Sequence, residues 1–163
     1  MAELKDRIKT VLDESRMLIL GSQVLLGFQF IAMMMEGFEQ LPTASRYVRL
    51  VSLLLVALSV ILLMTPAAYH RLVEKGENTE HFHLFASRML LASMVPLALG
   101  LAADFYVVAL KVAESQTLAL AGGFLMLLFF YGLWFGFTLS RRRRHERGAR
   151  TPVTKSKEKQ LAA

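Results

Sequence analysis

The stretch YHRLVEKGENTEHFHLFASR, residues 69–88, decides the fold of this chain. It is a polar hairpin that holds three of the four histidines, and two long apolar runs lie on each side of it. A run of about 20 apolar residues crosses a lipid bilayer as a helix, because a helix satisfies its own backbone polar groups there. A polar segment with two such runs before it and two after it therefore predicts four membrane-spanning helices.

The composition agrees with one membrane bundle and excludes several other classes of protein. The 163 residues are 55% hydrophobic with a mean hydropathy of +0.44, which is too apolar for an ordinary soluble domain. The chain has no cysteine, so disulfides, thiolate catalysis and cysteine metal ligands are excluded. Its net charge of +6 comes with arginines beside the apolar runs, where orientation signals lie, so we expect no nucleic-acid partner.

The apolar runs divide the chain into three regions. The predicted spans cover residues 17–35, 49–69, 87–111 and 118–139, within an all-α transmembrane domain over residues 17–140. Residues 1–16 have apolar side chains at helical spacing, so they predict an amphipathic helix at the membrane surface that continues into the first span. Residues 141–163 begin with RRRRHERGAR and have little apolar content, which predicts a disordered basic tail.

Basic residues gather on one side of the predicted membrane. Those on the hairpin side are Lys5, Arg7, Lys9, Arg16, Arg71, Lys75, Arg88 and residues 141–144. Those on the opposite side are Arg46, Arg49 and Lys111. Short loops rich in lysine and arginine stay in the cytoplasm, so both termini and the hairpin are predicted to be cytoplasmic.

A short repeat relates the two halves of the chain. The tetrapeptide SRML at residues 15–18 returns at residues 87–90, an offset of 72, and the same offset places the second span on the fourth. Two halves with two spans each would be parallel copies related by an axis along the membrane normal. The sequence thus raises a parallel two-helix repeat as a hypothesis.

Polar side chains follow one face of the first span. Ser15, Ser22, Gln29 and Glu36 recur every seven residues, and Arg16 and Gln23 form a neighbouring line. Residues seven apart stay nearly on one face of a helix, and polar side chains within a span avoid lipid. We therefore expect this stripe to face protein or water.

Asp104 lies inside the third predicted span and has two interpretations. In the first, its carboxylate takes up a proton or small cation at the mouth of a polar pathway. The residues that would line this pathway are Gln23, Gln29, Ser93 and Gly100. In the second, which the sequence favours, Asp104 forms an ion pair with Arg49 or Arg46, which enter the membrane from the same side at similar depth.

The hairpin histidines raise the question of a metal site. His70 ends the second span, and His81 and His83 precede the third, at the same end as Asp13 and Glu14. Imidazole and carboxylate groups together can hold zinc, and two histidines on facing helices can hold haem. The alternative is a hydrated loop whose histidines cap carbonyls or meet lipid phosphate. Because no rigid ligand spacing such as HExxH is present, we expect no cofactor.

Charged residues at the same end suggest a network. Asp13, Glu14 and Arg16 lie at the head of the first span, and Arg88 lies at the head of the third. Opposite charges there could fasten the two halves together. Acidic residues in a first turn also suit the helix dipole, so the network needs no role beyond structure.

The fourth span and the tail suggest two kinds of partner. Gly132 and Gly136 lie four residues apart in a stretch dense in aromatic residues. Such a pair of small residues lets another helix approach closely, so we hypothesise a homo-oligomer contact there. The basic tail predicts an affinity for anionic lipid.

Three stretches of the chain resemble a known family, and they are DESRMLILGSQVLLGFQF (residues 13–30), PAAYHRLVEKGENTEHFHLFASRML (residues 66–90) and PLALGLAADFYVV (residues 96–108). They are similar to a bacterial family of small four-span membrane proteins of unknown function. The resemblance covers most of the chain except its ends, and it implies a multi-pass protein of the bacterial plasma membrane. Some relatives carry automatic labels of sodium/proton antiporters, but the resemblance assigns no residue a role.

Three classes of function remain open. The first is a small transporter or channel-like protein that moves protons or small cations, which the polar stripe on the first span favours. The second is a non-catalytic accessory or assembly subunit, in which the hairpin and tail bind a partner. The third is a metal or haem membrane protein that uses the histidines. No nucleotide-binding loop, nucleophile elbow or paired catalytic carboxylate is present, so an enzyme is the least expected.

Overall fold

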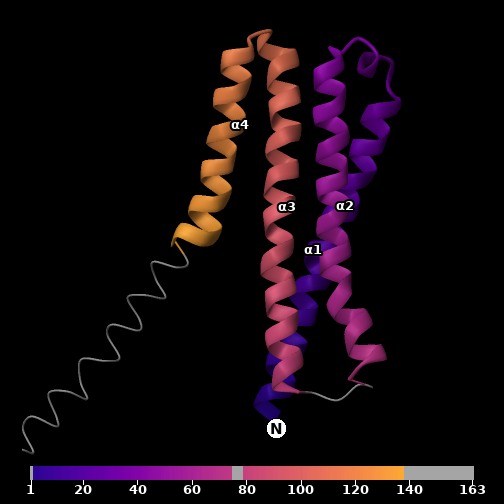
Figure 1. Cartoon of the computed structure of the whole chain (residues 1–163), viewed down its shortest axis with the longest axis vertical. Helices are drawn as coiled ribbons and strands as arrows, with labels where there is room; N and C mark the ends of the chain where they lie inside the picture. Colours follow the sequence, from indigo (N-terminus) through magenta and orange to yellow (C-terminus); the bar gives the residue numbers. More distant parts are fainter. Residues whose placement is uncertain (1, 75–78, 138–163) are drawn as a thin grey trace, which may run out of the picture. The chain divides into compact units, whose positions relative to one another are not determined.

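The computed structural model describes residues 2–74 and 79–137, and within them the chain is helical. The four α-helices are α1 (Ala2–Met34), α2 (Thr43–Leu72), α3 (Glu80–Ala113) and α4 (Gln116–Tyr131) (Figure 1). A short 3-10 helix η1 (Glu36–Phe38) follows α1, and a π-helix η2 (Gly132–Phe137) follows α4. These described residues contain no strand, and four helical segments are long and apolar enough to cross a membrane. The all-α class with four spans is therefore confirmed.

The hairpin and the loops give the helices defined ends. Thr79 precedes α3, and its hydroxyl accepts a hydrogen bond from the backbone N–H of Phe82 at 3.1 Å, which caps the helix. Pro42 precedes α2, where its fixed φ suits the start of a helix. Glu114 ends α3 in the left-handed conformation with φ 50°, and its N–H bonds Leu110 O. These residues therefore define the start of α2 and both ends of α3.

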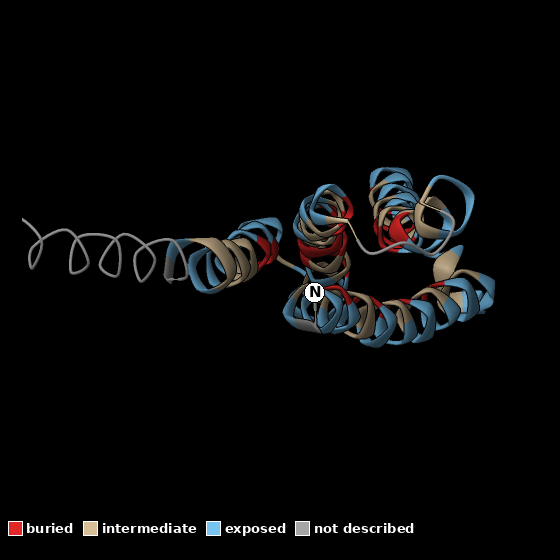
Figure 2. Ribbon diagram, turned by 90° about the horizontal axis from the view of Figure 1, so that it is seen from below, coloured by how far each residue is buried: buried red, intermediate tan, exposed pale blue. Residues whose placement is uncertain are grey.

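Buried residues of α1, α2 and α3 recur every seven positions. They are Ile8, Ser15, Ser22 and Gln29 on α1, Ser45, Ser52, Ser59 and Pro66 on α2, and Ala86, Ser93, Gly100 and Val107 on α3. Figure 2 shows the buried residues of these helices on the surfaces that face one another. A seven-residue repeat keeps one seam facing its neighbours in a left-handed supercoil. Small and hydroxyl-bearing residues in that seam let membrane helices approach closely.

The first turns of α1 pack against protein at the hairpin end. Ile8 forms a buried apolar cluster with Phe82 and Ala86 of α3, and Leu4 and Tyr69 are among the partly buried residues around it. The sequence predicts an interfacial helix over residues 1–16, and residues 2–16 share one continuous helix with the first span. At about 1.5 Å per residue α1 is longer than the roughly 30 Å of hydrocarbon in a bilayer, so part of it extends beyond the membrane.

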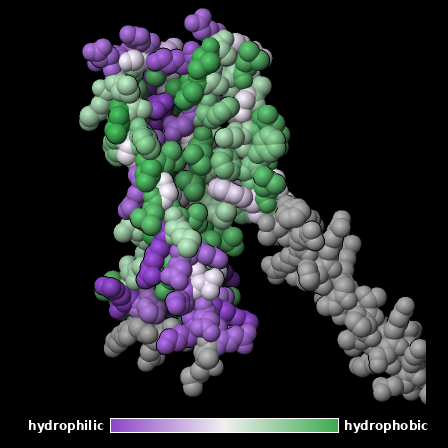
Figure 3. Space-filling model, turned by 180° about the vertical axis from the view of Figure 1, so that it is seen from behind, coloured by the Kyte–Doolittle hydropathy of each residue, from purple (hydrophilic) through white to green (hydrophobic). Residues whose placement is uncertain are grey.

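Hydropathy is distributed along the helices as a membrane requires. Figure 3 shows hydrophilic residues at both ends of the described helices and a hydrophobic surface between them. Many large apolar side chains of this surface are exposed, such as Phe28, Ile61 and Leu91. Exposed apolar side chains are costly in water and are suited to lipid.

The chain divides into two units, residues 1–124 and 125–163. Within the first unit, α4 lies close to α3, because a Cβ at Gly123 would be 3.3 Å from Tyr106 Cβ and one at Gly122 would be 3.0 Å from Phe105 Cε1. Within the second unit, the Phe130 and Trp134 rings lie 4.9 Å apart. The basic tail at residues 141–163, Lys75 and His145 lie outside the described residues.

Gly132 and Gly136 lie in η2, so the backbone departs from the α-helix that the pattern of small residues assumes. Both are exposed, and a Cβ at Gly132 would have no atom within 4 Å. The oligomer contact through these glycines stays a prediction.

The buried faces of α1 and α3 do not follow the SRML repeat. Ser15 is buried, whereas Ser87, its equivalent at an offset of 72, is partly exposed. The seven-residue lines on the two helices correspond at an offset of 71, which pairs Ser15 with Ala86 and Ser22 with Ser93. One residue rotates a helix face by about 100°, so the tetrapeptide does not mark equivalent positions in the two halves.

Gly100 is a position where α2 and α3 approach closely, and a methyl group there is expected to destabilise the fold. A Cβ at Gly100 would lie 2.8 Å from Val56 Cγ2 and 3.2 Å from the backbone oxygen of Ser52. We expect Gly100→Ala to lose about 1–3 kcal/mol by overpacking, offset by up to about 1 kcal/mol of helix propensity. Thermal unfolding in detergent measures the change. Gly27→Ala is the matched control, since no atom lies within 4 Å of its Cβ, and a drop there as large as at Gly100 would contradict the packing argument.

Candidate functional site

The three packed helices meet in a hydrogen-bonded polar cluster, which we define as Gln29, Ser52, Gly100 and Asp104. Gln29 Nε2 donates to Ser52 Oγ at 2.9 Å and to Asp104 Oδ2 at 2.5 Å. Ser52 Oγ in turn donates to the backbone oxygen of Gly100 at 2.8 Å. One side chain from each helix therefore takes part, so the cluster ties α1, α2 and α3 together.

The polar cluster lies within the predicted spans and is largely buried. Gln29 is 2% exposed and Ser52 is fully buried, while Asp104 is partly buried. Asp104 lies about 11 Å from the midpoint of α3 at 1.5 Å per residue. Polar groups at such a depth are costly unless they are paired.

Two oxygen atoms of the cluster are buried without a hydrogen-bond partner among the described residues, and they are Gln29 Oε1 and Asp104 Oδ1. Gln29 uses both N–H groups of its amide, one toward Ser52 and one toward Asp104. The unpartnered atoms are thus both acceptors, and they belong to two side chains that already contact each other. Each of them can still accept a hydrogen bond from a donor.

A cleft of about 250 Å³ lies between this cluster and the loop end of the bundle. Its lining includes Ala32, Arg49 and Val107, which lie three residues from Gln29, Ser52 and Asp104 on their respective helices. Residues three apart on a helix are stacked about one turn from each other. All three helices therefore place the cleft about one turn beyond the polar cluster, toward η1.

A second polar region lies at the hairpin end. A cleft of about 150 Å³ is lined by residues that include Ser15, Arg16 and His70. His70 is half-buried with its ring 4.7 Å from that of Phe82, and its Nε2 atom is buried without a partner. Between the two ends, Ser22 on α1 has a buried hydroxyl that also has no partner in the described chain. Polar atoms free to accept or donate a hydrogen bond thus recur along the bundle interior.

The structure separates the predicted polar stripe into a buried and an exposed part. Ser15, Ser22 and Gln29 face protein, each no more than 3% exposed. Glu36 and Gln23 are exposed, and the neighbouring line of Arg16 and Gln23 faces outward. The interior contribution of the first span therefore comes from a single seven-residue line.

Asp104 is placed against Gln29 and forms no ion pair with either arginine that the sequence offered. The ion pairs of the described residues are Arg7–Glu3 and Arg16–Asp13, both within α1. Arg46 instead donates to the backbone oxygens of Leu41 and Glu39 at 3.0 Å and 3.1 Å. Arg49 has a buried Nε atom with no partner in the described chain.

Three residues of the predicted hairpin-end cluster, Asp13, Arg16 and His70, line one cleft, whereas the other predicted members do not join them there. Arg16 bonds Asp13 at 3.0 Å on its own helix, and Glu14 and Arg88 are exposed without an ion pair to each other. His81 is exposed and His83 is half-buried on the first turn of α3. No three His, Cys, Asp or Glu side chains of residues 2–74 and 79–137 converge as metal ligands do.

Ser52 is the member of the cluster that the sequence did not single out as a site residue. Its signal was the seven-residue line Ser45, Ser52 and Ser59, which becomes informative once α2 is known to face Gln29 and Gly100. Ser59 makes a comparable contact nearer the hairpin, where its hydroxyl donates to the backbone oxygen of Ser93 at 2.9 Å.

Ser52→Ala is expected to destabilise the protein more than Ser59→Ala. Removing Ser52 Oγ leaves the Gln29 amide with an unpaired buried N–H, which costs about 1–3 kcal/mol. Ser59→Ala removes a donor to a single backbone oxygen, and interhelical hydrogen bonds in membranes average about 0.6 kcal/mol. Unfolding of the two variants in the same detergent measures the difference. Equal losses would show that the Gln29 contact contributes nothing beyond one ordinary hydrogen bond.

Four apolar helical segments, three of which enclose a polar cluster, define this chain as a multi-pass α-helical membrane protein. It belongs to the family of unknown function DUF6328, whose family model matches residues 2–138. No curated protein and no solved structure matches the chain.

Proposed function

We propose that this protein carries protons through the interior of the α1–α2–α3 bundle and that Asp104 is the group that binds and releases them. The observation that supports the proposal is the pair of buried, unpartnered acceptors Asp104 Oδ1 and Gln29 Oε1 on two side chains that already share a hydrogen bond. Ionisable residues inside membrane bundles are rare because they are costly, and they commonly mark proton or ion pathways.

One proton would satisfy both unpartnered oxygens. A carboxylate only accepts hydrogen bonds, whereas a protonated carboxyl gains an O–H donor. A proton on Asp104 Oδ1 would make that atom a donor, and we assign Gln29 Oε1 as its acceptor because it is the other unpartnered oxygen on this pair of side chains. The amide of Gln29 is therefore suited to hold the neutral carboxyl, and loss of the proton removes one of the two hydrogen bonds.

The ligands favour a proton over a metal cation. Hard cations take about six or more oxygen ligands, and two unpartnered oxygens are available in the polar cluster. The loop-end cleft supplies no further side-chain oxygen for a metal ion, because no acidic, amide or hydroxyl residue is among its lining.

The proposal requires access to Asp104 from both ends. The loop-end cleft lies about one helical turn away, and the hairpin-end cleft contains Ser15 and His70. Ser22 lies between, seven residues or about 10 Å from both Ser15 and Gln29 along α1. Water has to bridge these intervals. With the orientation predicted from the basic residues, the hairpin-end cleft faces the cytoplasm and the loop-end cleft faces the other side of the plasma membrane.

Proton flux into liposomes tests the proposal. Purified full-length protein is reconstituted with a trapped pH dye, and a potassium diffusion potential set by valinomycin drives the flux. We expect acidification of the lumen faster than in protein-free liposomes when the lumen is negative. The absence of such flux, together with a stoichiometric partner in pull-downs, would favour the accessory-subunit alternative that the sequence left open.

A further inference from the structure

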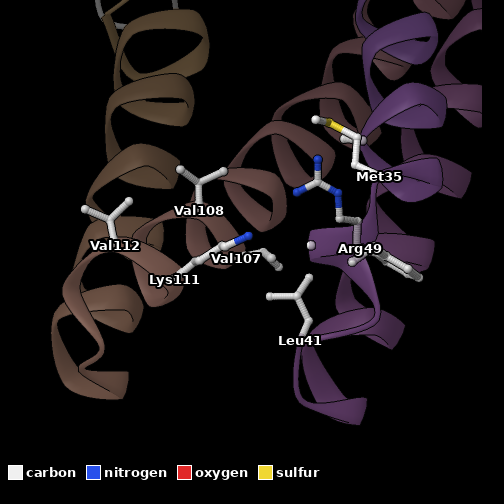
Figure 4. Close-up of a pocket in the computed structure, with 10 residues that line it drawn as sticks. Met35, Leu41, Arg49, Val107, Val108, Lys111 and Val112 are labelled. Atoms are coloured by element: carbon white, nitrogen blue, oxygen red, sulfur yellow. The ribbon is translucent and has the colours of Figure 1, made fainter.

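The loop-end cleft has a charge and a shape that the proton pathway does not explain. Arg49 of α2 and Lys111 of α3 line it, and Figure 4 shows the nitrogen ends of both side chains extending into the space between the two helices. Arg49 Nε is buried and unpartnered, and neither side chain forms an ion pair within the described residues. Two positive charges in one cleft repel each other, and an anion bound between them would remove that repulsion.

Nearby acidic groups do not supply that anion. Glu36 and Glu39 lie on the loop between α1 and α2, but both are exposed and neither lines the cleft. Asp104 lies about one turn below and is engaged by Gln29. The Lys111 ammonium lies close to Gly37 of the loop, since a Cβ at Gly37 would be 2.9 Å from Lys111 Nζ.

The rest of the lining is apolar and continues onto the outer surface of the helices. Met35, Val108 and Val112 all line the cleft, and they are 63%, 50% and 80% exposed. Exposed apolar side chains on a membrane helix face acyl chains. The cleft thus joins a cationic interior to a lipid-facing apolar rim near the end of the spans.

We propose that this cleft binds the phosphate group of an anionic phospholipid, with Arg49 and Lys111 as its ligands and the apolar rim against an acyl chain. Arginine presents a fork of N–H donors that matches phosphate oxygens, and lysine adds a point charge. The cleft of about 250 Å³ has room for a phosphate, and the proposed proton pathway would then pass this bound phosphate at its loop end. A free anion would use the two cations but would leave the apolar rim without a role, so the rim favours a lipid.

Lipid binding by the full-length protein in detergent tests the proposal. Native mass spectrometry measures the affinity for phosphatidylglycerol and for phosphatidylcholine. We expect phosphatidylglycerol to bind more tightly, and each basic residue to contribute about fivefold, so that Arg49→Gln/Lys111→Gln weakens binding about 25-fold. Lys9→Gln/Arg88→Gln removes the same charge from exposed positions at the hairpin end, and this control is expected to keep the wild-type affinity.

Three outcomes would overturn the proposal. They are equal affinity for phosphatidylcholine and phosphatidylglycerol, wild-type binding by the double variant, and binding of inorganic phosphate that depends on Arg49 and Lys111 in the same way. The last result would assign the cleft to a soluble anion. If the double variant does not fold, as judged by circular dichroism, Lys111→Gln alone carries the test, because Lys111 is exposed.

Discussion

Asp104→Asn is expected to reduce proton flux through reconstituted protein to the level of protein-free liposomes. An amide cannot release a proton in the physiological range, so the substitution removes the one group in the polar cluster that can bind and release one. The shape of the side chain is nearly unchanged. The measurement is the initial rate of pH change at a fixed membrane potential, compared at equal protein per liposome.

The same variant is expected to fold as well as the wild type or better. An amide at position 104 can donate a hydrogen bond to Gln29 Oε1, which has no partner in the wild-type structure. It thereby imitates the protonated carboxyl permanently, and one additional buried hydrogen bond contributes about 0.5–1.5 kcal/mol. Loss of flux with a retained or raised melting temperature would therefore separate a functional carboxyl group from one that only supports the fold.

Two further variants sharpen this expectation. Asp104→Glu keeps an ionisable group but moves it by one methylene, so we expect partial flux. Glu114→Gln changes an exposed carboxylate outside α3 and is expected to leave the flux unchanged. If Asp104→Asn conducts protons as fast as Glu114→Gln does, Asp104 is not on the pathway, and the polar cluster serves packing alone.

The seven-residue pattern made the buried side of α1 predictable from the sequence. Ser15, Ser22 and Gln29 follow one line, and a polar line inside an apolar helix has one favourable place, which is against protein or water. The neighbouring line with Gln23 looked similar but faces outward. The sequence alone shows that this helix has a polar face. How much of that face is buried depends on how closely the adjacent helices approach.

The partner of Asp104 was less predictable. Charge and depth suggested Arg49 or Arg46, since opposite charges attract at long range, whereas the contact with Gln29 depends on the rotation of α1 about its axis. Gly100 contributes to that arrangement by letting α2 approach α3. Such rotations follow from the packing of all three helices together, and no local pattern in the sequence fixes them.

The packing of residues 1–16 could likewise not be derived from periodicity alone. An apolar stripe on a helix suits a membrane surface and a protein surface equally well. The structure places Ile8 against Phe82 and Ala86, and Phe82 lies in the hairpin that divides the two halves of the chain. The same apolar stripe thus contributes to the protein core.

Phe82→Ala is expected to cause the largest loss of stability in the chain. Phe82 is fully buried, its ring stacks on that of Tyr69 at 6.3 Å, and it lies in the cluster that joins α1 to the start of α3. Replacing a buried phenylalanine by alanine costs about 3–5 kcal/mol, from lost burial and from the cavity that remains. On the scale of soluble proteins of this size this corresponds to a fall in melting temperature on the order of 10 °C.

The loss is expected to begin at one end of the molecule, because the cavity separates the first turns of α1 from α3 while the polar cluster near the loop end stays intact. Hydrogen exchange of the Phe82→Ala variant should therefore rise in residues 3–12 before it rises around Ser52. Phe28→Ala is the matched control, since Phe28 is 66% exposed on the same helix as Ile8 and has no place in the core. Equal destabilisation by both variants, or uniform exchange along α1, would mean that the Ile8–Phe82–Ala86 cluster does not hold this end of the bundle.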